Sequence, residues 1–220
     1  MNDNSLFDLQ DAIKKKNIEF SNLSLEQRDN FELGLIAVKT SAYNYKHLSE
    51  RLRNDLDIAY VAFARIGWPL KYSGDKVKSD IDLVIRAVTS SDFALEFASK
   101  ELQNNPEVVK AACVGKWRNG DAFRFASNEL KSNKEFIRLI YPTSIEVLKY
   151  VDKSIFKDFN FIVSLVETNF LGVKYLNDRL KNNKKLAEIV VKINPRSIYL
   201  FSNKIQTHPK ILMLAYENGL

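Results

Sequence analysis

The chain has 220 residues, of which 45% are hydrophobic and 27% are charged, so it can bury a core and is not an intrinsically disordered polypeptide. Seven glycines, five prolines and a single cysteine argue against a many-stranded barrel or sandwich and exclude a disulfide framework or a cysteine-rich zinc site. The N-terminus, MNDNSLFDLQ, lacks the basic start and apolar stretch of a signal peptide, and no run of 18 apolar residues is present. We therefore expect a soluble, cytoplasmic protein without a membrane span, with delivery into a host cell as an alternative.

The formal net charge of +6 is unevenly distributed. Residues 1–110 hold 15 Lys and Arg against 17 Asp and Glu, whereas residues 111–220 hold 18 against 10. A basic half of this kind suits nucleic acid, an acidic protein or an anionic membrane surface. The basic residues are scattered among acids and form no dense block, so an ordinary solvated helical surface explains them as well.

The first predicted elements form an N-terminal cap. Residues 5–16 place Leu6, Leu9 and Ile13 on one stripe, as an amphipathic helix does. Residues 30–38 match the spacing of the later segments in part, because Asn30 lies 25 residues before Asp55. We assign residues 1–42 to this cap and partial repeat.

From residue 43 onward, a pattern of about 25 residues recurs, in which an aromatic residue is followed five positions later by an aliphatic anchor. Successive anchors are separated by 25, 25, 28, 25, 25 and 25 residues, and this regularity indicates tandem repeats. The anchors are Leu52, Val77, Leu102, Leu130, Ile155, Leu180 and Ile205.

Three residues after each anchor, the sequence predicts the start of a helix. Six of these seven residues are Asp or Asn, whose side chains accept hydrogen bonds from the first N–H groups of a helix. They are Asp55, Asp80, Asn105, Asn133, Asp158, Asn183 and the exception, His208. Apolar residues then recur with helical spacing, as in Ile81, Val84, Ile85 and Val88.

Each repeat is therefore expected to be a short helix, a tight turn and a longer helix. Such a hairpin buries its apolar face only against its neighbours. The predicted fold is all-α: a solenoid of about seven helix-turn-helix repeats, forming one continuous domain over residues 43–220.

Two segments support a resemblance to a known family. ASKELQNNPEVVKAA (98–112) and ASNELKSNKEF (126–136) resemble the units of a bacterial and protist tandem-repeat family that is catalogued only as a domain of unknown function. The resemblance covers about residues 43–220 and implies a bacterial α-hairpin array. It implies no catalytic residues.

Residues that could support catalysis or bind a metal are few. His47 occupies a position that is aromatic in other repeats, His208 occupies a helix N-cap, and Cys113 falls on a predicted core position. Phosphate-binding, zinc-protease and serine-hydrolase motifs are absent. We expect no enzyme, no catalytic residue, no metal and no cofactor.

Two features are candidates for partner binding. One is a basic edge: four of the seven residues directly after the anchors are cationic, namely Arg53, Lys78, Lys131 and Lys181. The alternative interpretation is that these cations bind no partner and only interact with the partial negative charge at the C-terminal ends of the short helices. The other feature is the three-residue insertion between the third and fourth repeats, which contains Lys116, Trp117 and Arg118. Trp and Arg are enriched at binding hot spots, although Trp117 could equally fill the gap that the insertion leaves.

The predicted function is protein–protein interaction through an extended solenoid surface. The alternative is nucleic-acid binding through the basic C-terminal half and the basic edge. The last repeat ends with an apolar helix that includes Ile211, Leu212, Leu214, Ala215 and Tyr216. We therefore also expect either self-association through this repeat or an origin in a longer array.

Overall fold

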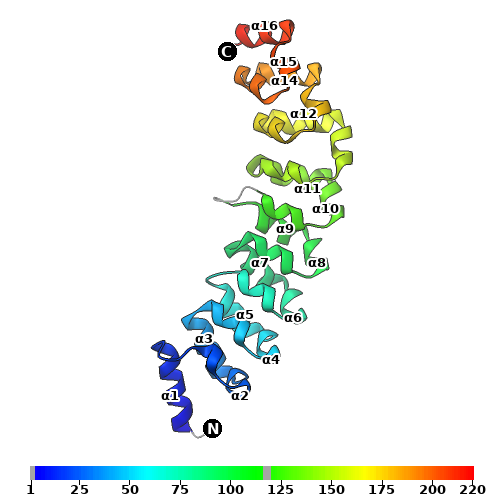
Figure 1. Ribbon diagram of the computed structural model, residues 1–220. Coiled ribbons are helices and arrows are strands. Elements are labelled where there is room, and N and C mark those ends of the chain that lie inside the picture. The colour runs from blue at the N-terminus through cyan, green and yellow to red at the C-terminus, as the bar shows by residue number, and fades with distance from the viewer. Residues whose placement is uncertain (1–2, 116–119) are drawn as a thin grey trace. The chain divides into compact units, whose positions relative to one another are not determined.

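The computed structural model describes residues 3–115 and 120–220, and within them every regular element is a helix (Figure 1). The prediction of an all-α fold is confirmed. The chain divides into two compact units, Met1–Ala112 and Cys113–Leu220, which are described separately as unit 1 and unit 2. The predicted boundary at residue 42 and the single domain over residues 43–220 stay predictions.

The elements alternate between α-helices and short 3₁₀ helices, which carry the label η. The α-helices of unit 1 are α1 (Asp3–Lys14), α2 (Leu25–Arg28), α3 (Phe31–Thr40), α4 (Glu50–Arg53), α5 (Leu56–Phe63), α6 (Asp75–Lys78), α7 (Ile81–Ser90), α8 (Lys100–Gln103) and α9 (Pro106–Cys113), whose last residue lies in unit 2. Its 3₁₀ helices are η1 (Phe20–Asn22), η2 (Ala42–His47), η3 (Trp68–Tyr72) and η4 (Asp92–Phe97).

Unit 2 continues the same alternation. Its α-helices are α10 (Asn128–Ser132), α11 (Lys134–Ile140), α12 (Phe159–Thr168), α13 (Asp178–Lys181), α14 (Lys184–Ile193), α15 (Asn203–Gln206) and α16 (Pro209–Glu217). Its 3₁₀ helices are η5 (Asp121–Phe125), η6 (Tyr141–Thr143), η7 (Ile145–Lys149), η8 (Lys153–Lys157), η9 (Phe170–Tyr175) and η10 (Pro195–Leu200).

The predicted short helix of each segment is in fact two elements, and on this point the helix-turn-helix prediction was wrong. In residues 42–63, for example, η2 is followed by the one-turn helix α4 and then by α5. A second capping residue, three positions before the anchor, separates the first two elements. Ser49, with extended backbone, accepts a hydrogen bond from the backbone N–H of Leu52 at 3.2 Å, so the chain leaves the 3₁₀ helix there and starts a new helix.

The predicted capping residues after the anchors are confirmed for Asp and Asn. Asp80 Oδ1 accepts from the N–H of Leu83 at 2.9 Å, and Asn183 Oδ1 accepts from the N–H of Leu186 at 3.0 Å. His208 makes no such bond. The long helix of each segment therefore begins where the sequence predicts it.

We expect the Asp80→Ala substitution to lower the free energy of unfolding by about 1 kcal/mol, because one N–H group at the start of α7 loses its acceptor. Asp80→Asn keeps an acceptor and should recover most of that loss. Urea unfolding followed by circular dichroism measures both variants. Equal losses of unfolding free energy in Asp80→Ala and Asp80→Asn would show that the charge of the carboxylate stabilises α7 and that its capping hydrogen bond does not.

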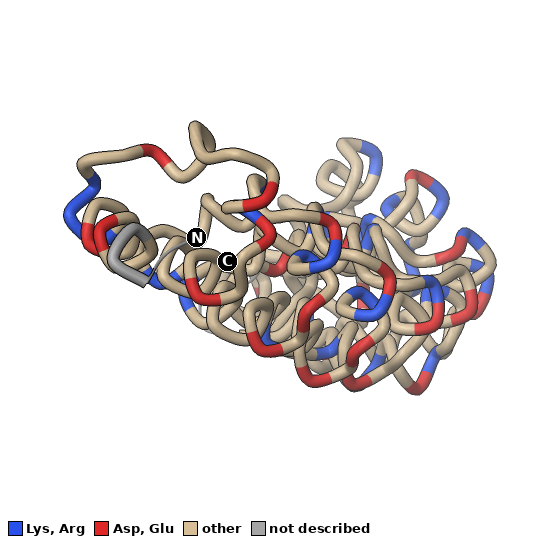
Figure 2. Tube along the Cα trace, turned by 90° about the horizontal axis from the view of Figure 1, so that it is seen from below, with Lys and Arg blue, Asp and Glu red and all other residues tan. Residues whose placement is uncertain are grey.

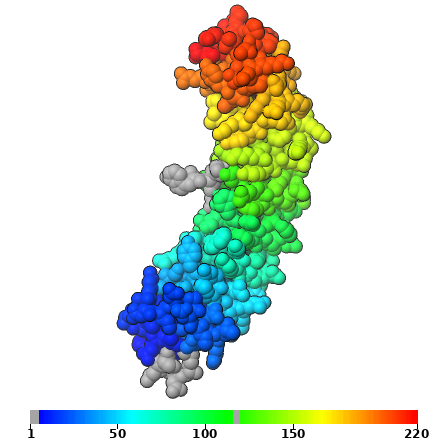
Figure 3. Space-filling model, in the orientation of Figure 1, coloured from blue at the N-terminus to red at the C-terminus, as the bar shows by residue number. Residues whose placement is uncertain are grey.

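Within unit 1, equivalent helices of successive segments pack side by side. α3 packs against α5 and α5 against α7, while η2, η3 and η4 form a second row. The anchors Leu52 and Val77 are fully buried. In the space-filling view, successive parts of unit 1 occupy successive bands of the surface (Figure 3). Each segment therefore buries its apolar side chains mainly against its neighbours in sequence.

Unit 2 is organised in the same way. α12, α14 and α16 pack in succession, and η5, η7, η9 and η10 form the corresponding row. The buried anchors here include Leu130, Ile155, Leu180 and Ile205. The extra three residues before α10 leave this order within the unit unchanged.

A backbone hydrogen bond links consecutive segments inside both units. The N–H of the residue three before an anchor donates to the carbonyl of the residue after the preceding anchor. The pairs are Gly74 to Arg53, Ser99 to Lys78, Asp152 to Lys131 and Ser202 to Lys181, and the equivalent bond in the N-terminal segment joins Ser49 to Arg28, at 2.9–3.2 Å. This bond satisfies polar backbone groups at the end of each short helix.

A buried phenol stabilises the second segment of unit 1. The Tyr45 hydroxyl donates to the carbonyl of Arg53 at 2.6 Å and accepts from the Ser73 hydroxyl at 3.0 Å. The side chain is fully buried, and this burial raises the pKa of Tyr45 to about 12.

Unit 1 should lose stability as the pH rises from 10 to 12. The folded state holds the Tyr45 proton more tightly than the unfolded chain does, so the stabilisation is complete below pH 10 and is lost as the pH passes the folded-state pKa. Two pKa units correspond to roughly 3 kcal/mol. Urea unfolding at a series of pH values measures the loss, and Tyr45→Phe should abolish this part of it. Tyr43→Phe is the control, because the side chain of Tyr43 is exposed. If both variants reduced the pH dependence of the free energy of unfolding equally, the assignment to Tyr45 would be contradicted.

Candidate interaction surface

The predicted basic edge is mostly bonded to the protein itself. The Arg53 guanidinium donates to the carbonyl of Tyr72 at 3.3 Å, Lys131 Nζ donates to the carbonyl of Arg124 at 2.6 Å, and Lys181 Nζ donates to the carbonyl of Lys174 at 2.8 Å. These carbonyls lie at or near the ends of 3₁₀ helices. The contacts favour the interpretation in which these cations complement helix ends.

Lys78 is half-buried like the other three edge residues. Its carbonyl accepts the hydrogen bond from Ser99 described above. Burial lowers the pKa of Lys131, which is a further sign that this side chain lies against the protein surface. A role of the edge in partner binding stays a prediction.

The insertion lies largely outside the described residues. Lys116, Trp117 and Arg118 all fall in the segment 116–119, for which no structure is described. Gly120, which follows it, has a φ of +86°, as expected for a glycine-dependent turn. The predicted contact role of Trp117 and Arg118 therefore stays a prediction.

The two histidines and the cysteine occupy the predicted kinds of position. Cys113 is fully buried, and His47 is half-buried. Burial and the neighbouring charges of Lys46 and Arg28 lower the pKa of His47, so its ring is neutral at pH 7. Within residues 3–115 and 120–220, no three His, Cys, Asp or Glu side chains are grouped in a way that could hold a metal ion.

The last helix, α16, has one buried and one open side. Ile211 and Ala215 are buried, whereas Met213 and Tyr216 are exposed. This apolar exposure is compatible with the predicted self-association, which stays a prediction.

A row of exposed aromatic side chains crosses the 3₁₀ helices of unit 1. Tyr43 on η2, Trp68 on η3 and Phe93 on η4 have exposed fractions of 60%, 39% and 43%. They occupy equivalent positions 25 residues apart, and η2, η3 and η4 are neighbours. We call these three residues the aromatic strip. Exposed aromatic side chains at adjacent positions are typical of interaction surfaces.

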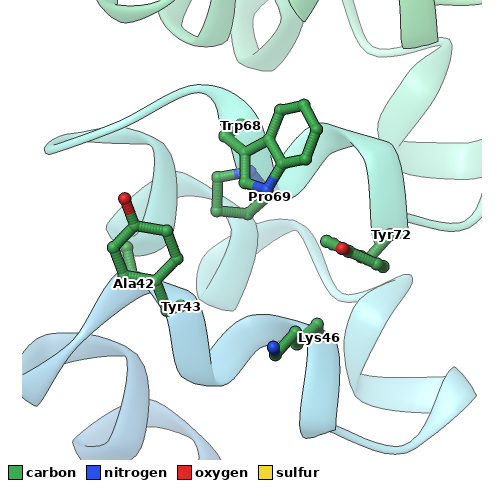
Figure 4. A pocket seen from close by; sticks show the side chains of 6 residues that line it. All are labelled: Ala42, Tyr43, Lys46, Trp68, Pro69 and Tyr72. Atoms are coloured by element: carbon green, nitrogen blue, oxygen red, sulfur yellow. The ribbon is translucent and has the colours of Figure 1, made fainter.

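The strip contains a small pocket between η2 and η3 (Figure 4). It is lined by Ala42, Tyr43, Lys46, Trp68, Pro69 and Tyr72 and has a volume of about 40 Å³. A cavity that holds one water molecule has a volume of roughly 10–15 Å³. The pocket is a few times larger and therefore has room for a small apolar group. Figure 4 shows the rings of Tyr43 and Trp68 on either side of Pro69, with Lys46 and Tyr72 across from them.

The rings hold one another in place. Trp68 packs edge-on against Phe97, with centroids 5.7 Å apart, and against Tyr72 at 6.5 Å. Lys71 Nζ lies 5.0 Å from the centroid of the Trp68 ring, within the range of a cation–π interaction. The Trp68 ring is thus oriented by its neighbours while keeping an exposed face.

Charge is divided along this surface. Lys46 on η2 and Lys71 on η3 are exposed cations, whereas η4 carries Asp92 and Glu96. The surface is therefore basic beside Tyr43 and Trp68 and acidic beside Phe93.

The corresponding surface of unit 2 has a different composition. Asp121 and Glu146 stand at the positions of the aromatic strip. Asp121 Oδ1 accepts from the Tyr150 hydroxyl at 2.7 Å and Glu146 Oε1 from the Tyr175 hydroxyl at 2.9 Å, and Lys149 Nζ pairs with Asp121 at 3.1 Å. Polar bonds within the protein occupy these two side chains, and the next two equivalent positions hold Leu171 and Arg196, so no aromatic residue stands at the four strip positions of unit 2.

The sequence analysis missed the aromatic strip. No binding role was predicted for Tyr43, Trp68 or Phe93. Trp68 begins η3, and the aromatic residues five positions before the anchors are half-buried: Tyr72, Phe97, Phe125, Tyr150 and Tyr175. The 25-residue spacing of Tyr43, Trp68 and Phe93 was a signal that could have revealed the strip.

Basic and acidic positions are interspersed along the chain in each unit (Figure 2). In the described part of the chain, no helix is long and apolar enough to cross a bilayer, in agreement with the prediction of no membrane span.

Comparison with known proteins identifies one family. No curated protein and no solved structure matches the chain. A family model described as Domain of unknown function (DUF4116) matches residues 62–103 and 80–113, a region that includes η3, η4 and all of α9. The predicted resemblance to a family of unknown function is thereby confirmed, and over residues 62–113 the chain matches the DUF4116 family.

Proposed function

We propose that the protein is a protein–protein interaction module, built as an α-solenoid of about seven 25-residue repeats with an N-terminal helical cap. The recurring capping residues, the buried anchors and the backbone bonds between consecutive segments support this architecture. Such an array offers a row of equivalent surface positions, and side chains at those positions can be varied without disturbing the core.

The aromatic strip is the observation that carries the proposal. Tyr43, Trp68 and Phe93 expose large apolar rings at adjacent equivalent positions, although the anchors on which the packing depends are buried elsewhere. Tyr and Trp are the residues most enriched at the centres of protein interfaces. Rings that stay exposed at the equivalent positions Tyr43 and Trp68 are better explained by a partner than by packing.

Nucleic-acid binding is the weaker candidate. The net charge of residues 111–220 favours it, but Lys131 and Lys181 donate to carbonyls of the protein. The acidic residues on the 3₁₀ row of unit 2, Asp121 and Glu146, also oppose a phosphate backbone on that surface.

Affinity capture tests the proposal. The tagged full-length chain is incubated with nuclease-treated extract of its source cells, and retained proteins are quantified by mass spectrometry. Three variants are compared with the original chain: Tyr43→Ala combined with Trp68→Ala for the strip, Lys131→Glu combined with Lys181→Glu for the edge, and Tyr60→Ala. Tyr60 is 57% exposed on α5 and serves as the control.

We expect a protein that the original chain and the Tyr60→Ala variant retain and that at least one of the two double variants loses. Absence of any such protein would contradict the interaction function. Retention that occurs only in a parallel extract without nuclease treatment, together with salt-sensitive binding of an oligonucleotide, would favour the nucleic-acid alternative.

A further inference from the structure

We propose that the aromatic strip of unit 1 binds an extended, proline-containing peptide segment, with an acidic residue of that segment beside Lys46 and Lys71. This inference rests on the proposed interaction function. It adds the chemical class of the ligand and states which end of the strip its acidic residue contacts.

The size and lining of the pocket favour such a segment. Its volume of about 40 Å³ has room for a side chain of a few atoms. Tyr43, Trp68, Pro69 and Tyr72 surround it (Figure 4). Aromatic-lined grooves recognise proline-rich segments in the polyproline II conformation, which loses little entropy on binding because it is already extended.

The polar groups of the strip suit the backbone of that conformation. Polyproline II segments make no internal hydrogen bonds, so their carbonyl groups need external donors. Trp68 offers an indole N–H, and Tyr43 and Tyr72 each offer a hydroxyl. Within residues 3–115 and 120–220, none of these three groups donates a hydrogen bond to another residue. All three residues line the pocket.

Charge complementarity defines the polarity of the ligand. Lys46 lines the pocket, and Lys71 Nζ lies 5.0 Å from the ring centroid of Trp68 and 5.9 Å from that of Phe97 on η4, so an anionic side chain is attracted to η2 and η3. Asp92 and Glu96 make the η4 end acidic. A peptide with an acidic end and a neutral or basic end matches both halves. A uniformly anionic oligonucleotide would be repelled at η4, and a quaternary ammonium ligand would be repelled by the two lysines.

Selection from a library tests this proposal. The full-length chain is used to select from a phage-displayed library of random dodecapeptides, with the Tyr43→Ala/Trp68→Ala variant as the subtraction control. Enriched peptides are synthesised with a fluorescent label, and their affinities are measured by anisotropy. Oligouridine RNA carrying the same label serves as the second probe.

We expect enrichment of peptides that contain proline together with Asp or Glu near one end. Trp68→Ala and Tyr43→Ala should each weaken their binding at least about tenfold, as substitutions at hot spots do. Tyr199→Ala, which removes a 64% exposed tyrosine from η10 in unit 2, should change the affinity less than about twofold. Circular dichroism of each variant checks that its fold is kept.

A charge exchange provides a test that does not depend on the rings. Lys46→Glu should weaken binding of the acidic peptides and strengthen binding of the same peptides with their acidic residues replaced by lysine. A purely structural role of the pocket would give no such reversal.

Three results would overturn the proposal: no enrichment above the subtraction control, enrichment of peptides without proline or acidic residues, or affinities that Trp68→Ala and Tyr43→Ala leave unchanged. Oligouridine binding that depends on Trp68 would assign the strip to nucleic acid instead. If the affinity capture described above still yields a partner when the selection fails, the interaction function stands and only the assignment of the strip is wrong.

Discussion

Gly67→Ala should destabilise unit 1 by about 3 kcal/mol, near the upper end for overpacking in a core. A Cβ atom at this position would lie 1.9 Å from the carbonyl oxygen of Ala87 and 2.6 Å from its carbonyl carbon. These are backbone atoms in α7, so the clash is relieved only if α7 moves away from the start of η3. The φ of Gly67 is −82°, and the requirement for glycine here is therefore space, not an unusual backbone conformation.

Gly74→Ala is the matched control for Gly67→Ala. Its Cβ would meet Asn54 Oδ1 at 2.5 Å, which is the end of a flexible side chain. Asn54 Oδ1 accepts from the N–H of Lys76 at 3.0 Å, so the expected cost is one hydrogen bond, about 1 kcal/mol. Urea unfolding followed by circular dichroism measures both variants. Equal losses of stability in Gly67→Ala and Gly74→Ala would show that moving α7 away from η3 costs no more than the loss of one hydrogen bond.

The second large effect is expected for a core anchor. Leu180→Ala should lower the free energy of unfolding by about 2–5 kcal/mol, because the loss of a buried side chain leaves a cavity. Leu180 is 1% exposed on α13, and its N–H donates to the capping Asn177 at 3.0 Å. The substitution removes apolar contacts and leaves this backbone bond in place.

Leu139→Ala is the matched control, since the same atoms are removed from a side chain that is 54% exposed on α11 in the same unit. Its effect should stay within about 0.5 kcal/mol. Thermal and urea unfolding are measured for both variants, with hydrogen exchange to localise the loss to unit 2. Similar losses for Leu139→Ala and Leu180→Ala would mean that the anchors do not form the core.

The anchors, the helix starts and the all-helical class could be read directly from the sequence. A buried aliphatic side chain every 25 residues and a capping Asp or Asn three residues later are local signals, and both are found in the structure, for example at Leu180 and Asn183. The division of the first helix was also encoded locally. The capping residue Ser49 was visible in the sequence, but the 3₁₀ helix before it gives no clear periodicity.

Only the tertiary structure decided which side chains are available to a partner. The sequence places Arg53 and Lys181 in a row of cations that could bind a partner. In the structure, their side chains donate hydrogen bonds to carbonyl groups of the protein. The carbonyl of Tyr72 comes within reach of Arg53 only when the next segment packs against it, and the carbonyl of Lys174 comes within reach of Lys181 when its own segment folds. The charge pattern of the sequence alone therefore did not reveal these bonds. Trp68 has a large aromatic side chain of the kind that usually packs in a core. In the structure, η2, η3 and η4 pack side by side and leave its ring exposed in line with Tyr43 and Phe93. The period of the sequence predicts which residues are equivalent, whereas burial depends on how neighbouring segments cover one another.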